Sequence, residues 1–155
     1  MIVLAVSFFV ALADQLTKHF VRLNLPGRTV DVIPGFFTLR YVRNTGAAWG
    51  IFEGFNNWLV LLSAVMLTAI FIFRRHLLDG TALSRLALGL MTGGIIGNLA
   101  DRVRLGYVVD FLDFHLSGHH FPAFNIADAA ICAGVSLYVF TQVSRKYPAK
   151  TTETP

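Results

Sequence analysis

Two aspartates in apolar surroundings are the residues of this sequence best suited to chemistry. Asp110 lies in the run YVVDF and Asp128 lies in the run NIADAA. Two carboxylates that are brought close together do not both ionise easily, so one pKa rises and the pair shares a proton. The ionised member can then take a proton from water, and the protonated member can hydrogen-bond a scissile carbonyl. Such a pair is equipped to hydrolyse an amide bond without a metal ion.

The fold must bring these two aspartates together, because they lie 18 positions apart (128 − 110). They cannot share one helix face, and they meet only if the segment between them folds back over the helix that carries Asp128. The alternative is that Asp110 and Asp128 simply form ion pairs with Arg102 and Arg104. Spacing alone leaves both interpretations open.

Amide and charged side chains accompany the two aspartates at helical spacing. Asn98 shares a helix face with Asp101 at i,i+3 and with Arg102 at i,i+4, and Asn125 shares one with Asp128 at i,i+3. An ionisable residue costs about 2.5–3.5 kcal/mol at the centre of a membrane helix, so a function is the default hypothesis for such residues. Before this cluster, glycines recur at every fourth position, which predicts a smooth face for close helix packing. They are Gly89, Gly93 and Gly97.

A metal site is the competing chemical interpretation. His115, His119 and His120 lie close together beside Asp113, and zinc accepts such ligands. The Ser-Gly pair at 117–118 breaks any helix there, and no supporting pattern surrounds the histidines. We therefore expect solvated loop histidines, no metal and no cofactor.

The composition favours a membrane protein. Of the 155 residues, 55 % are hydrophobic and 14 % are charged, against roughly 25 % charged in an ordinary soluble domain. This excludes a disordered chain and a disulfide scaffold, and a soluble globule of this size has no means of covering so much apolar surface. The net charge of +4 is scattered between apolar runs, so no nucleic-acid partner is expected. The single cysteine, Cys132, excludes an internal disulfide and is expected to be buried.

The apolar runs predict an all-α membrane protein with four transmembrane helices, forming a single domain over residues 1–155. A span takes about 20 apolar residues, and the predicted spans are about 1–21, 58–73, 82–99 and 121–143. Segments 29–33 and 36–42 are rich in β-branched and aromatic residues, so a small β element at about 22–57 should lie on the membrane surface. Residues 101–120 are expected to form a polar loop. The first span ends with Asp14 and Lys18 facing each other at i,i+4.

Two questions stay open at this point. The basic residues divide six against six between the two sides, so the positive-inside rule does not fix the orientation. A non-enzymatic alternative is a four-span transporter subunit or lipid-binding protein that uses Asp14, Asp101, Asp110 and Asp128 as an ion path. These four acids gather towards one end of the spans, whereas a relay should distribute them through the membrane depth.

Five motifs, in order and over nearly the whole chain, resemble those of the bacterial lipoprotein signal peptidases (signal peptidase II). They are DQxxK at 14–18, RNTGAAW at 43–49, GNxxDR at 97–102, VVDF at 108–111 and FPxFNIAD at 121–128. The resemblance implies a membrane-embedded aspartic peptidase that cleaves diacylglyceryl-modified prolipoproteins just before the lipid-bearing cysteine. Asp110 and Asp128 match the catalytic pair. Four residues match polar residues that line the site and position substrate, namely Asn44, Asn98, Arg102 and Asn125. Three match motif residues whose role looks structural, namely Asp14, Lys18 and Asp101.

The resemblance also implies a location and an orientation. The protein would be a monomer of the bacterial cytoplasmic (inner) membrane in contact with lipid, with both termini cytoplasmic. Its active site would face the outer side, where the extracytoplasmic β element forms a cradle. Trp49 stands where the family usually has phenylalanine, and we expect it to reshape the wall of the pocket.

Overall fold

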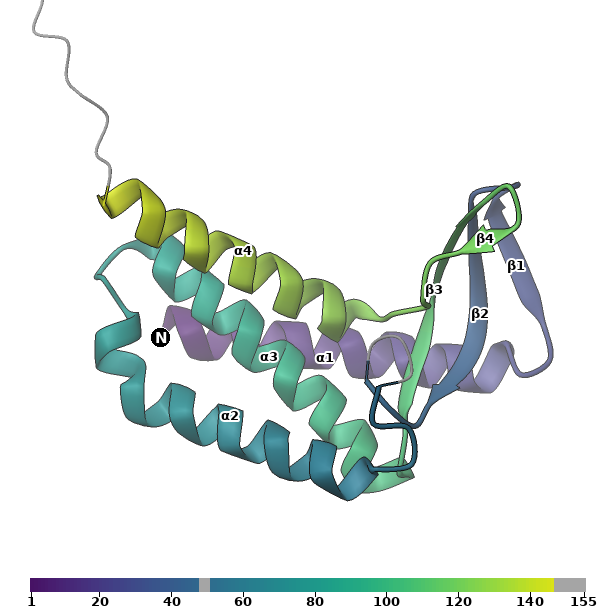
Figure 1. The fold of residues 1–155 in the computed structure, drawn as a ribbon, viewed down its shortest axis with the longest axis horizontal. Helices are drawn as coiled ribbons and strands as arrows, with labels where there is room; N and C mark the ends of the chain where they lie inside the picture. The colour runs from purple at the N-terminus through teal and green to yellow at the C-terminus, as the bar shows by residue number, and fades with distance from the viewer. Residues whose placement is uncertain (48–50, 147–155) are drawn as a thin grey trace, which may run out of the picture.

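Four long helices form the body of the molecule. This computed structural model describes residues 1–47 and 51–146. The helices are α1 (Ile2–Asn24), α2 (Asn56–Leu77), α3 (Ala82–Leu105) and α4 (Ile126–Lys146), and they run roughly along one direction (Figure 1). All four are long and apolar enough to cross a membrane, which confirms the predicted four-span class.

Helix α3 is the centre of the bundle, because α1, α4 and α2 all pack against it. Its glycine face allows the close approach of α1 that the sequence predicts. A Cβ atom added at Gly89 would lie 2.7 Å from the Val6 Cβ atom, and one at Gly93 would lie 2.7 Å from the Ser7 carbonyl oxygen. Only glycine lets the two helices approach this closely.

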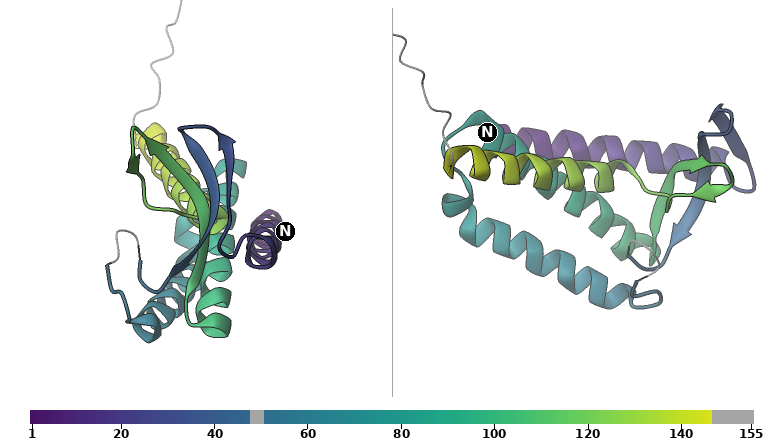
Figure 2. Two further views of the ribbon diagram at one scale, coloured as in Figure 1. Left: turned by 90° about the vertical axis from the view of Figure 1, so that its right-hand side faces the viewer. Right: turned by 45° about the horizontal axis from the view of Figure 1, so that its top comes forward.

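An antiparallel sheet lies across one end of the bundle (Figure 2). Its strands are β1 (Thr29–Ile33), β2 (Phe37–Asn44), β3 (Val108–Leu116) and β4 (His119–His120), in the order β1-β2-β3-β4. The first two strands confirm the predicted β element between the first two spans. Gly35, with φ of 75°, lies in the turn that joins them.

The predicted polar loop at 101–120 is wrong. Residues up to Leu105 continue α3, and most of the remainder forms β3 and β4. The reason is that β3 has an apolar side. Val109 and Phe111 are buried against Val21 of α1 and Leu25, the residue that follows this helix, while the backbone of β3 pairs with β2. The sheet therefore combines segments from two separate connections of the helical bundle.

Helix α4 begins at Ile126, later than the predicted start at residue 121. The preceding segment is held by β3 instead, because the Phe124 amide donates to the Leu112 carbonyl at 3.1 Å and the Leu112 amide donates back at 2.9 Å. Asp128 therefore lies in the first turn of α4, at the end that meets the sheet. The expectation for Cys132 is also wrong, because this residue is exposed on α4, one turn further along.

Candidate active site

A buried lysine joins α1 to α3 beside the candidate site. Lys18 of α1 is 1 % exposed. Its Nζ atom lies 2.8 Å from Asp14 Oδ2 and 3.1 Å from Asp101 Oδ2, and it donates to Asn98 Oδ1 at 2.9 Å. A buried ion pair is tolerated only when further hydrogen bonds satisfy its charges, and this lysine has three oxygen partners.

The two carboxylates of this network hold the elements that carry the paired aspartates. Asp14 Oδ1 accepts a hydrogen bond from the Ala127 amide at 2.9 Å, at the start of α4. Asp101 Oδ2 accepts one from the Val109 amide at 3.0 Å, next to Asp110 on β3. Lys18 thus holds two carboxylates, and each of these carboxylates accepts a hydrogen bond from a backbone amide. These side chains fix the backbone on each side of the site.

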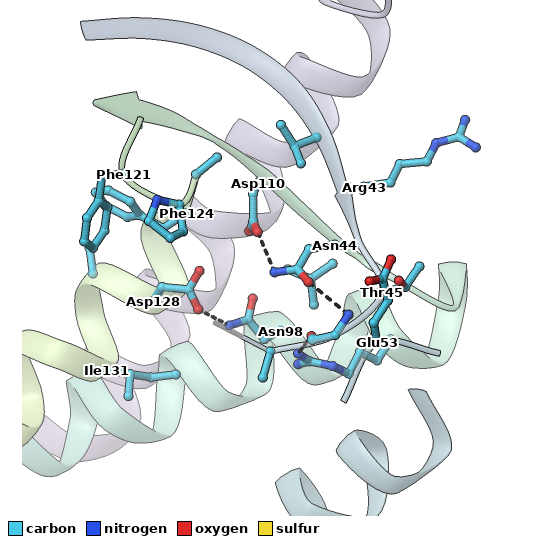
Figure 3. A pocket seen from close by; sticks show the side chains of 18 of the residues that line it. Arg43, Asn44, Thr45, Glu53, Asn98, Asp110, Phe121, Phe124, Asp128 and Ile131 are labelled. Atoms are coloured by element: carbon cyan, nitrogen blue, oxygen red, sulfur yellow. Dashed lines mark hydrogen bonds between the residues drawn. The ribbon is translucent and has the colours of Figure 1, made fainter. Parts of the chain in front are cut away.

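Asp110 and Asp128 face the same space from different elements (Figure 3). Asp110 is held by two amide donors, Asn44 Nδ2 at 2.8 Å to Oδ2 and Asn125 Nδ2 at 2.7 Å to Oδ1. Asp128 Oδ1 accepts from Asn98 Nδ2 at 2.7 Å, and Asp128 Oδ2 accepts from the Asn125 backbone amide at 3.2 Å. Every oxygen of the pair thus has a fixed donor.

Two of the asparagines, Asn98 and Asn125, also connect the two aspartates to each other. Asn125 Nδ2 reaches both Asp110 and, at 3.1 Å, Asn98 Oδ1. Asn98 in turn contacts Lys18 and Asp128. The polar residues that the sequence singles out are therefore one continuous hydrogen-bonded set at the junction of α3, α4 and the sheet.

The alternative in which Asp110 and Asp128 pair with arginines does not hold for the residues that the structure describes. Neither carboxylate there forms an ion pair with Arg102 or Arg104. Arg102 Nη2 donates to the Gly46 carbonyl at 3.1 Å, and Arg104 Nη1 donates to Gln15 Oε1 at 3.3 Å. Arg102 instead holds the loop that follows β2 over the site.

The environment of Asp110 favours its protonated form. The residue is 1 % exposed. Burial raises the pKa of Asp110, and the nearby charge of Asp128 raises it further, to about 7, although the hydrogen bonds from Asn44 and Asn125 oppose the shift. A carboxyl that keeps its proton near neutral pH beside a second, ionised carboxylate is what two nearby carboxylates are expected to show.

A cavity of about 740 Å³ opens in front of the pair. Its walls come from β2, from the loop after it, from α3, from β3, from residues 121–124 and from α4. The wall nearest the spans is apolar and includes Ala129 and Ile131, whereas the wall towards the sheet includes Arg40 and Val42. The side chains of Asp110 and Asp128 both line this cavity.

Some residues of the site were not assigned a role from the sequence. Glu53 and Thr45 line the cavity, and Gln15 donates to Asp101 Oδ1 at 3.0 Å and to the Gly97 carbonyl at 3.1 Å. Gln15 belongs to the DQxxK motif, which was the available signal. Trp49, which was expected to reshape the wall of the pocket, lies outside the residues that the structure describes.

All three histidines lie in the strands of the β3–β4 hairpin, so the expected loop is wrong, whereas His119 and His120 are exposed as expected. His120 Nδ1 lies 3.0 Å from Asp113 Oδ2, and His115 Nε2 lies 3.0 Å from Thr38 Oγ1. Their rings stack with centroids 4.8 Å apart, because the two residues are cross-strand partners. His119 is exposed.

We predict that Gly97→Ala destabilises the protein by about 1–3 kcal/mol, as overpacking of a close contact does. An added Cβ atom at Gly97 would lie 2.5 Å from Asp14 Oδ2 and would push that carboxylate away from Lys18. Thermal unfolding in detergent measures the effect. Ile96→Ala, one residue earlier on the exposed side of α3, is the matched control and should change the midpoint little. Equal midpoints for the two variants would contradict this account of the packing.

Four apolar helices and a pair of facing aspartates define a membrane-embedded hydrolase of the aspartic class, and comparison with known proteins identifies its family. Residues 6–144 match the family model described as signal peptidase (SPase) II. The chain therefore belongs to the signal peptidase II family, and it is an enzyme of the bacterial inner membrane.

Individual relatives cover most of the chain. A protein of Geobacter metallireducens named lipoprotein signal peptidase is 42 % identical over 92 % of this chain and 88 % of its own length. One of the same name from Syntrophotalea carbinolica is 43 % identical over 91 % of this chain and 90 % of its own. A bacterial membrane enzyme structure solved by the in meso method at 2.3 Å superposes with a TM-score of 0.85 at 33 % identity, covering 99 % of this chain and 94 % of the other.

Proposed function

We propose that this protein removes signal peptides from diacylglyceryl-modified prolipoproteins by cutting just before the lipid-bearing cysteine. The observation that carries this proposal is the pair Asp110 and Asp128, which face one cavity at the sheet end of the four apolar helices. The names of the relatives support the substrate class. The family and this geometry speak against the alternative of a transporter subunit or lipid-binding protein.

The proposed reaction uses the pair as acid and base. Ionised Asp128 takes a proton from water as the water oxygen attacks the scissile carbonyl carbon, and protonated Asp110 hydrogen-bonds the carbonyl oxygen. The C–N bond then breaks, and the cysteine nitrogen receives a proton. The products are a signal peptide with a free carboxylate and a lipoprotein with a free amine.

The remaining polar residues fix the orientation of the two aspartate side chains. Asn44 and Asn125 orient the Asp110 carboxyl, and Asn98 orients Asp128. Arg102 binds the loop at Gly46, which closes one side of the cavity. We assign these four residues to positioning the pair and the substrate, with no metal or cofactor in the reaction.

The substrate explains why the site lies at the end of membrane helices. A signal peptide is an apolar segment, and each buried methylene of an attached acyl chain adds about 0.8 kcal/mol to its membrane affinity. A peptidase whose cavity begins among apolar spans meets such a substrate without extracting it. Incubation with a lipid-modified and an unmodified prolipoprotein tests this directly. Cleavage of the modified form alone is expected, and equal cleavage of both would contradict the proposal.

The proposed orientation puts both termini in the cytoplasm and the sheet on the outer face. The start of α1 and the end of α4 lie together at the end of the bundle away from the sheet (Figure 1). Arg74 and Arg75 end α2 at that side, as do Arg145 and Lys146 for α4, in keeping with the positive-inside rule. All parts of the site come from one chain, so we propose that the monomer is active.

The raised pKa of Asp110 predicts a pH dependence. A carboxyl whose pKa is raised to about 7 keeps its proton below that pH and loses it above, so the activity should decline as the pH rises through about 7. Initial rates between pH 5 and pH 9 measure this falling limb of the pH–rate profile. The pair titrates as a unit, so the limb reports the pair rather than one residue. Asp31→Asn, a change to an exposed carboxylate on β1, should leave the limb in place. A rate that stays constant across neutral pH would contradict the shared proton.

A further inference from the structure

A buried ion pair holds an arginine at the sheet end of the cavity. Asp113 on β3 is 1 % exposed, and its Oδ2 atom lies 2.9 Å from Arg40 Nε on β2. His120 Nδ1 contacts the same carboxylate at 3.0 Å. Asp113 is therefore a fixed anion inside the sheet region, and it holds the inner nitrogen of the Arg40 guanidinium by an ion pair without a hydrogen bond.

The outer part of this guanidinium is available to a ligand. The Nε atom of Arg40 is buried, but the side chain as a whole is 37 % exposed, and the residue lines the cavity. Within residues 1–47 and 51–146, neither terminal Nη atom has a hydrogen bond or an ion pair. Arg40 thus presents a permanent positive charge and free N–H donors to the cavity, in an orientation set by Asp113.

The position of Arg40 along β2 indicates which part of a substrate it meets. Val42 pairs with Asp110 across the sheet, and Arg40 lies two residues before Val42 on β2, where the register with β3 is irregular between Leu39 and Val42. At about 3.3 Å per residue, this is roughly 7 Å beyond the row of Asp110, the length of about two residues of extended peptide. The cavity wall on the other side of the pair is the apolar one formed by α4.

The direction of the substrate follows from the proposed function, on which this inference rests. The apolar signal segment would lie beside the spans, with the scissile carbonyl over Asp110 and Asp128. The chain that follows the scissile bond must then leave towards the sheet. Its second and third residues come within reach of Arg40.

We propose that Arg40 binds the segment that follows the scissile bond by donating to its acceptor oxygens, so that an acidic side chain there is favoured over a basic one. Charge-assisted hydrogen bonds to a carboxylate are stronger than those to a neutral carbonyl. A lysine at the same place meets a fixed positive charge. Arg40 is in this account a specificity-determining residue, and Asp113 is the residue that positions it.

The test uses three diacylglyceryl-modified substrates that differ only at the residue after the modified cysteine, which is Asp, Asn or Lys. For the unaltered protein, kcat/KM for the Asp substrate should exceed that for the Lys substrate by about tenfold, the lower range for a hydrogen bond to a charged group. The difference should lie in KM rather than in kcat.

Two variants separate recognition from a structural role of the ion pair. Arg40→Gln removes the charge but leaves Asp113 with less compensation, which is destabilising for a buried carboxylate. The double variant Arg40→Gln/Asp113→Asn removes both charges, so no uncompensated carboxylate is left in the sheet. Both should bring the ratio of the two kcat/KM values to about one. Arg28→Gln, an exposed arginine before β1 that does not line the cavity, should leave the ratio unchanged.

The results of these assays separate a failure of the proposed role of Arg40 from a failure of the proposed peptidase function. A ratio near one in the unaltered protein, or a tenfold ratio that persists in both Arg40 variants, would overturn the inference while cleavage itself is intact. Failure of the unaltered protein to cleave any of the three substrates would overturn the proposed function, and the inference with it.

Discussion

Asp110→Asn and Asp128→Asn should each lower the rate of prolipoprotein cleavage by at least about 100-fold, and by as much as about 10,000-fold, the range that a positioned acid or base contributes. An asparagine at either position has no proton to share and no carboxylate to accept one from water. The measurement is the initial rate of signal peptide release by purified variants in detergent or vesicles.

Folding has to be measured beside activity in these variants. Both Asp110 oxygens accept from amide groups of Asn44 and Asn125, and an asparagine there satisfies only one of those donors. A modest loss of stability is therefore expected, together with intact membrane insertion. Asp31→Asn is the control for removing an acidic charge outside the cavity and should retain full activity. Near-normal turnover in either Asp110→Asn or Asp128→Asn would show that the pair does not activate water.

The second large effect concerns the buried lysine. Lys18→Met should lower the free energy of unfolding by about 3–5 kcal/mol, because removing one partner of a buried ion pair leaves an uncompensated charge. Here two carboxylates, Asp14 and Asp101, lose the same partner. Since Asp14 holds the first turn of α4 and Asp101 holds β3, cleavage should fall as well. The midpoint of thermal unfolding in detergent and the rate of cleavage are the two readouts.

Arg75→Met provides the comparison for Lys18→Met. Arg75 is an exposed cation in the last turn of α2, so its loss should move the midpoint only slightly. If Lys18→Met were as stable as Arg75→Met, the network around Lys18 would not be what positions the site.

Residue periodicity was sufficient to predict the helices, because each of them is a long apolar run. It was also sufficient for β1, which lies between the two Pro-Gly turn signals, and for β2, which follows the second of them, because both segments are rich in β-branched and aromatic residues. It failed for β3, because the acids and histidines within 108–116 make this segment look like a polar loop. Asp110 and Asp113 are nevertheless buried, since each finds partners that only the folded sheet supplies. Burial of a charged residue depends on its partners, and those lie far away in the sequence.

For the candidate site, too, the sequence did not reveal contacts between residues that lie far apart along the chain. Motif matching selected Asp110, Asp128 and the asparagines, and the structure joins all of them in one set of hydrogen bonds beside the cavity. The roles of Gln15 and Arg40 could not be read from spacing. Gln15 reaches across to α3, and Arg40 depends on Asp113 of the neighbouring strand. Such contacts between separate elements depend on how the elements pack. For the same reason the sequence placed the start of α4 too early, because residues just before the helix pair with β3 through Phe124.

The most direct test of the account is the mass of the product. Purified protein is incubated with a diacylglyceryl-modified prolipoprotein, and the new N-terminus is determined by mass spectrometry, with Asp128→Asn in parallel. The account predicts a lipoprotein that begins at the modified cysteine, an intact released signal peptide and no product from the variant. Intact substrate after incubation with the unaltered protein, or a cut elsewhere in the chain, would contradict it.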